Sequence, residues 1–130
     1  MTYLRKPMVP VSWGELLDKI TILEIKTQQI HRPNACANVA KEYLLLKDIA
    51  GPAMDENGIS PLLQQLRDVN RALWTIEDAI REQEAKARFD REFIELARSV
   101  YKRNDVRASI KRQINLCLGS ELLEEKSYRG

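Results

Sequence analysis

Residues 60–80 read SPLLQQLRDVNRALWTIEDAI, and this stretch decides the fold. Ser60 followed by Pro61 is typical of an N-cap and a first helical position. The apolar residues behind them alternate spacings of four and three: Leu62, Leu66, Val69, Leu73, Ile76 and Ile80. This heptad seam predicts a long helix that packs antiparallel against the first helix of the chain, at a crossing angle of about 20°.

Two more helices are expected upstream of this stretch. Ser12 and Glu15 form an S-x-x-E capping box in front of apolar residues at helical spacings. A long first helix is therefore expected from this box to about His31, where a following proline disfavours α geometry. Asn34 can cap a second helix, which Gly51 ends.

Downstream, the apolar pattern predicts two shorter helices. The fourth helix runs from the Phe89 region, with Asp90 as its cap, to a break at Asn104 and Asp105. Asp105 then caps a fifth helix that Gly119 closes. The chain is thus expected to form an all-α, up-and-down antiparallel helical bundle with two long helices and shorter C-terminal helices. One helical domain over residues 1–130 accounts for the length.

The composition excludes several classes of protein. Of 130 residues, 44% are hydrophobic and 31% are charged, which is typical of a globular protein that dissolves in water. The formal net charge is +2, from 21 basic and 19 acidic residues, so no nucleic-acid partner is expected. No segment has the roughly 18 apolar residues of a membrane span, and the first residues lack a signal-peptide pattern. These features predict a cytoplasmic protein.

No cofactor or metal is expected either. Cys36 and Cys117 are far apart and lie in apolar helical patterns, so both are expected to be buried free thiols. With His31 as the single histidine, no zinc site of standard spacing can be assembled. No glycine-rich phosphate loop is present. Two carboxylate pairs at helical spacing leave magnesium binding open, although such pairs are common by chance: Glu92 with Glu95, and Glu121 with Glu124.

A second row of side chains lies one residue beyond the heptad seam. Its members are also spaced four and three: Asn70, Trp74, Glu77, Arg81 and Glu84. One interpretation is an ordinary ion pair between Glu77 and Arg81 beside a half-buried Trp74. The other is a groove in which Trp74 supplies a flat apolar wall while Asn70, Glu77 and Arg81 orient a polar ligand.

Basic residues concentrate on both sides of the expected break at Asp105: Arg98, Lys102, Arg103, Arg107, Lys111 and Arg112. Arg98, Arg107 and Lys111 are candidate phosphate ligands, assisted by the N-terminus of the expected fifth helix. The alternative is a solvated face paired with nearby carboxylates. A DNA-binding helix pair is disfavoured because the turn lacks the usual glycine.

The segment VSWGELLDKITILEIK at residues 11–26 resembles the opening of an uncharacterised bacterial helical family, a domain of unknown function. Further motifs resemble it in order: LW at 73–74, IED at 76–78, FIELAR at 93–98, IKR at 110–112 and EEKSY at 124–128. Members of that family occur beside glycosyltransferase segments. The resemblance therefore implies an accessory role in making surface polysaccharide, and it identifies no catalytic residues.

Two functional hypotheses follow. The first is a non-enzymatic helical accessory or protein-interaction module, with a protein partner such as a glycosyltransferase, or a homo-oligomer, bound through the charged surface and the groove near Trp74. The second is an enzyme or binder of a phosphorylated or nucleotide-linked small molecule, with Glu77 or Glu95 as base or Mg²⁺ ligand. The sequence leaves open whether the chain is an enzyme.

Overall fold

The computed structural model describes residues 3–127, and these form four α-helices and one short 3-10 helix, with no strand. The helices are α1 (Trp13–Gln29), α2 (Pro33–Ala50), η1 (Gly51–Asp55), α3 (Ile59–Ala85) and α4 (Arg91–Cys117). The prediction of an all-α helical bundle is confirmed.

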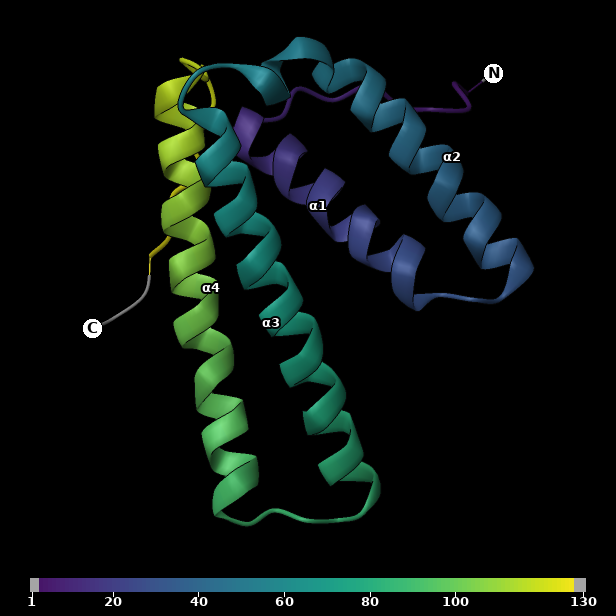
Figure 1. The fold of residues 1–130 in the computed structure, drawn as a ribbon, viewed down its shortest axis with the longest axis vertical. Coiled ribbons are helices and arrows are strands. Elements are labelled where there is room, and N and C mark those ends of the chain that lie inside the picture. The colour runs from purple at the N-terminus through teal and green to yellow at the C-terminus, as the bar shows by residue number, and fades with distance from the viewer. Residues whose placement is uncertain (1–2, 128–130) are drawn as a thin grey trace.

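The helices form two antiparallel hairpins of unequal length (Figure 1). The α1–α2 hairpin lies beside the first half of α3 and the second half of α4, and α1 diverges from them along its length. The other half of the α3–α4 hairpin extends past α1 and α2. We call this projecting part, residues 74–103, the arm; it lies beyond the side-chain hydrogen bonds that α1 makes with Arg71 of α3 and Arg107 of α4.

Local sequence explains how the helices begin. The Ser12 hydroxyl accepts a hydrogen bond from the Glu15 backbone N–H at 3.1 Å, so the predicted cap of α1 is confirmed. The cap predicted at Asn34 is wrong, because α2 begins at Pro33, whose missing N–H and fixed φ suit a first helical position. The cap of α3 is Gly58 rather than Ser60, and its φ of +86° is one that glycine adopts without strain.

Residues 91–117 form one continuous helix, so the expected break at Asn104 and Asp105 is wrong. Neither residue is a glycine or proline, and each costs a helix interior only about 0.5 kcal/mol relative to alanine. Continuous packing of α4 along α3 outweighs that cost. The cap at Asp90 is confirmed, since its carboxylate accepts from the Phe93 N–H at 3.2 Å. The expected shorter C-terminal helices are therefore a single helix of 27 residues, as long as α3.

The core lies between α1 and the halves of α3 and α4 that α1 covers. Its fully buried apolar side chains are Leu17, Ile20, Ile59, Leu66 and Ile114. The α3 seam changes along its length: Leu66 and Val69 are buried, whereas Ile76 and Ile80 in the arm are only half-buried. The antiparallel neighbour along the whole of α3 is α4 rather than α1, so the predicted partner of the seam is corrected.

The two cysteines are both free thiols, as expected, but the expectation that they are buried is wrong. Cys36 is partly buried and Cys117 is exposed in the last turn of α4. Within residues 3–127, no helix combines the length and the apolar content needed to cross a membrane.

Candidate functional site

A buried carboxylate joins α1, α3 and α4. Asp18 of α1 is 1% exposed, and the guanidinium of Arg107 on α4 forks onto it, with Nε 2.9 Å from Oδ1 and Nη2 bonded to Oδ2. The Asn70 amide of α3 donates to the same Oδ1 at 2.9 Å and to the Thr21 hydroxyl at 2.8 Å. A bidentate pair of this kind fixes geometry as well as charge.

A second cation, Lys111, continues this network one turn along α4. Its ammonium lies 2.8 Å from a Glu15 oxygen, 3.0 Å from a Glu124 oxygen and 4.0 Å from Oδ2 of Asp18. Burial lowers the pKa of Lys111, but the hydrogen bonds to Glu15 and Glu124 outweigh it and the net pKa is raised. The hydrogen bond to Asp18 raises the pKa of Arg107 against the effect of burial. Both cations therefore stay charged at neutral pH.

Gly14 allows α1 to touch α4 at this network. Its backbone N–H donates to the Asn115 side-chain oxygen at 2.6 Å. A Cβ at this position would lie 2.5 Å from the Lys111 carbonyl oxygen, closer than any real side chain allows. Glycine is thus needed here for close approach of two backbones.

The structure separates the three candidate phosphate ligands. Arg107 and Lys111 lie together, but each already faces carboxylates, and no helix begins at Asp105 to supply free N–H groups. Arg98 is exposed on the arm, more than two turns before Arg107, and does not line the cavity described next. The basic residues that are close in sequence are thus separated in the structure: Arg107 and Lys111 are neutralised by carboxylates, and Arg98 lies on the surface of the arm.

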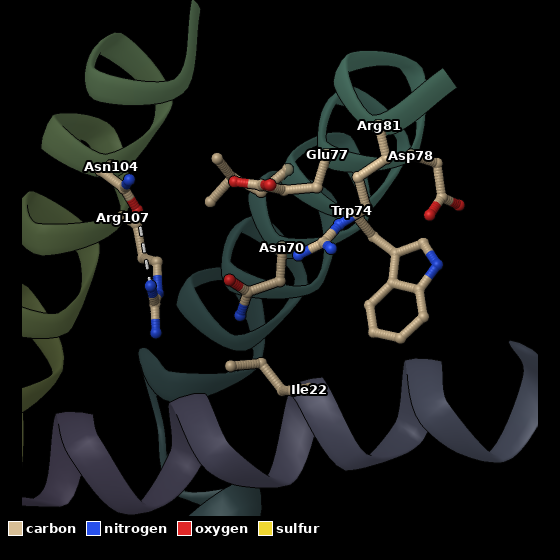
Figure 2. A pocket seen from close by; sticks show the side chains of 9 residues that line it. Ile22, Asn70, Trp74, Glu77, Asp78, Arg81, Asn104 and Arg107 are labelled. Atoms are coloured by element: carbon tan, nitrogen blue, oxygen red, sulfur yellow. Dashed lines mark hydrogen bonds between the residues drawn. The ribbon is translucent and has the colours of Figure 1, made fainter. Parts of the chain in front are cut away.

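A cavity of about 550 Å³ opens between α1, α3 and α4, beside the Asp18 network (Figure 2). Asn70, Trp74, Glu77 and Arg81, the row predicted from the sequence, line it together with Arg107. Figure 2 shows Glu77 extending toward the α4 side and Arg81 reaching down between Asn70 and Trp74. All four predicted residues line the cavity because they form one row on α3, which runs from the contact with α1 into the arm.

The charged members of this row lack partners. Within residues 3–127, neither Glu77 nor Arg81 makes an ion pair or a side-chain hydrogen bond, so the ordinary i,i+4 pair between them does not form. Trp74 is half-buried, while Glu77 and Arg81 are exposed. These side chains are free to meet another molecule.

A matching row on α4 was not identified from the sequence. Its residues are spaced three and four: Ile94, Ala97, Tyr101, Asn104, Ala108, Lys111 and Asn115. At one end Gly14 of α1 lies against Lys111 and Asn115, whereas in the arm Ile94 and Tyr101 are 53% and 54% exposed. We call the open part of both rows the arm face: Trp74, Glu77, Arg81, Glu84, Ile94, Ala97 and Tyr101.

Three residues of the network, Asp18, Thr21 and Gly14, were not predicted from the sequence. Asp18 lies between the core residues Leu17 and Ile20, and a charged residue inside an apolar helical face indicates a buried pair. That pattern would have marked Asp18 as a residue with a partner, although it would not have identified Arg107.

A model of a family of unknown function matches residues 8–130. No curated protein and no solved structure matches the chain.

Proposed function

The chain belongs to DUF6165, a family of unknown function, and we propose that it is a non-catalytic accessory module that binds a protein partner through the arm face. One observation carries the proposal: the rows of α3 and α4 that α1 covers continue into the arm uncovered. There they present exposed apolar side chains beside unpaired charges. Such a mixture is typical of a surface that another protein covers.

The energetics of the arm support a partner. In the arm, α3 has only α4 beside it, so its apolar residues Ile76 and Ile80 remain half-buried. Ile94 and Tyr101 are more than half exposed beside them. Removing apolar surface from water contributes about 25 cal/mol per Å². A helical partner along the arm face would therefore gain stabilisation where the chain itself leaves a hydrophobic surface open.

The charges favour binding of protein over binding of phosphate. The cavity is lined by two carboxylates, of Glu77 and Asp78, and by two guanidiniums, of Arg81 and Arg107. The Arg107 guanidinium is already bonded to the buried Asp18 carboxylate. A phosphorylated or nucleotide-linked small molecule would therefore meet one uncompensated guanidinium, that of Arg81, beside two carboxylates, which opposes its binding. The network cations also have raised pKa values, so neither exchanges protons at neutral pH as a general acid or base would.

The process in which the module works is also part of the proposal. The family resemblance of residues 11–26 and the later motifs implies an accessory role in bacterial surface-polysaccharide synthesis, and we include that role in the proposal. A cytoplasmic site of action is consistent with the free thiols of Cys36 and Cys117.

Photocrosslinking in cells tests the proposal. A photoreactive benzoylphenylalanine at Ala97, in the middle of the arm face, should give an adduct of defined mass with another polypeptide. The same group at Leu44, which is 65% exposed on α2, is the matched control and should give none. Absence of an adduct at Ala97, or equal labelling at both positions, would contradict the proposal.

The small-molecule alternative has its own assay. A thermal-shift screen with nucleotide sugars would show stabilisation of about 2.7 kcal/mol for a ligand at 100 times its dissociation constant. We expect no shift. A shift that disappears in Arg81→Gln would instead favour a ligand site in the cavity.

A further inference from the structure

We infer that the occupant of the arm face is a second copy of this chain, related by a two-fold axis that crosses the middle of the arm so that the two arms run antiparallel. The inference rests on the proposed function, because it names the partner of the same surface. A two-fold interface must be self-complementary: if one residue of the first copy contacts a second residue of the other copy, the reverse contact is made as well. The arm face satisfies this condition in both of its rows.

The α3–α4 hairpin places the middle of both rows at the same height, so that one axis can cross both. Residue 79 lies six positions before Ala85, the last residue of α3, and residue 97 lies six positions after Arg91, the first residue of α4. Because antiparallel helices rise equally from their turn, residues 79 and 97 lie at the same height. One axis can therefore pass through the middle of both rows.

The α3 row is complementary to itself about residue 79. Glu77 and Arg81 are equally far from this centre, so each faces the other across the axis, and two reciprocal ion pairs form. Both side chains are without a partner in the single chain. Trp74 and Glu84 exchange in the same way, which sets an indole N–H donor opposite a carboxylate.

The α4 row is complementary about the same level. Ile94 lies three positions before residue 97 and Tyr101 four positions after it, so the two side chains meet across the axis to within about one residue. Ala97 lies closest to the axis, where a small side chain lets two helices approach. The two apolar side chains of this face that are more than half exposed are thus the ones that the second copy covers.

The position of α1 selects the antiparallel arrangement. α1 lies against the same side of α3 and α4 that continues as the arm face, and it does so near only one end (Figure 1). If the arms were parallel, both copies of α1 would need the same space between the hairpins. With antiparallel arms, the two α1 helices lie at opposite ends of the assembly.

The size of the surface predicts the affinity. The arm face runs over 11 residues of α3 (74–84) and 8 residues of α4 (94–101), or about 16 Å and about 12 Å, and is two helices wide. This area is at the low end for specific protein interfaces. We therefore expect a dissociation constant in the micromolar range, reached at ordinary concentrations of purified protein.

A charge exchange tests the axis directly. Sedimentation velocity from about 1 to 200 μM should show a reversible monomer–dimer equilibrium. Glu77→Arg and Arg81→Glu should each raise the dissociation constant at least about tenfold, because each sets like charges opposite one another. The double variant restores both reciprocal pairs and should dimerise within about threefold of the parent. Lys102→Glu, exposed on the arm but off the row, is the control and should change nothing.

The outcomes separate this inference from the proposed function. A monomer at every concentration overturns the inference, and so does a dimer that neither single variant weakens. If the chain stays monomeric while benzoylphenylalanine at position 97 crosslinks to a different polypeptide, the proposed function stands and the inference of a second copy is refuted. An absence of any adduct at Ala97 overturns both. Circular dichroism of each variant checks that the helices are retained.

Discussion

Replacement of Gly14 by alanine distinguishes local helix preference from tertiary contact, because the two act in opposite directions. Alanine is favoured over glycine inside a helix by about 1 kcal/mol. If Gly14 faced solvent, Gly14→Ala would stabilise the protein. In the structure the added Cβ lies 2.5 Å from the Lys111 carbonyl oxygen, and ordinary contact begins at 3.4 Å. The backbones of α1 and α4 must therefore move apart by the difference, about 0.9 Å.

Such a movement has two costs. Overpacking of this size destabilises by about 1 to 3 kcal/mol. It also stretches the 2.6 Å hydrogen bond from the Gly14 N–H to the Asn115 side chain to the limit of bonding, and loss of that bond costs about 0.5 to 1.5 kcal/mol. After the gain in helix preference is subtracted, we expect a net loss of about 1 to 3 kcal/mol.

Urea unfolding followed by circular dichroism measures this value. Lys19→Ala, at an exposed position of the same helix, should change the free energy of unfolding by less than about 0.5 kcal/mol. If Gly14→Ala instead raised the unfolding midpoint, α1 would not lie against α4 at this point, and the placement of the Asp18 network would be refuted.

Three further predictions concern the buried polar groups. Asp18→Ala leaves the Arg107 guanidinium without its carboxylate and should cost about 3 to 5 kcal/mol in urea unfolding, whereas leucine at both positions should recover most of that loss. Lys111 lowers the pKa of Glu124, so this pair stabilises the fold above the unfolded-state pKa of about 4.5 and the gain is lost as pH falls through the folded pKa. Glu124→Gln should therefore reduce stability by under about 1 kcal/mol at pH 7, and the two stability curves should converge in acid, or the ion pair is absent. Gln83→Leu removes a buried amide oxygen that has no partner and should raise the free energy of unfolding by about 1 kcal/mol; a loss would mean that Gln83 is hydrogen-bonded in solution.

The parts of the fold that depend on local sequence could be predicted. The Ser12 cap and the apolar seam of α3 act through residues three or four apart, so both are visible in the sequence. The break at Asp105 was wrong because a good cap residue inside a helix is overridden when the helix packs continuously on its neighbour. Which helix lies beside α3 also depends on tertiary packing, and periodicity alone does not specify it.

The candidate site divides in the same way. The row from Asn70 to Arg81 could be predicted because it is one face of one helix. The role of Arg107 could not, since its carboxylate partner lies 89 positions earlier in the chain. A cluster of basic residues resembles an anion site until the acidic residues that neutralise it are placed beside it by the fold.

The distance between Asp18 and Arg107 along the chain has a consequence for synthesis. A ribosome adds about 5 to 20 residues per second, so α1 waits roughly 4 to 18 s for the residue that neutralises its buried carboxylate. During that time the Gly14 notch has no α4 to lie against, and the apolar side of α1 has only α2 and later α3 beside it. The α1–α2 hairpin is thus a late-folding unit despite being made first, and it is the segment of the nascent chain that most needs protection from aggregation until α4 leaves the exit tunnel.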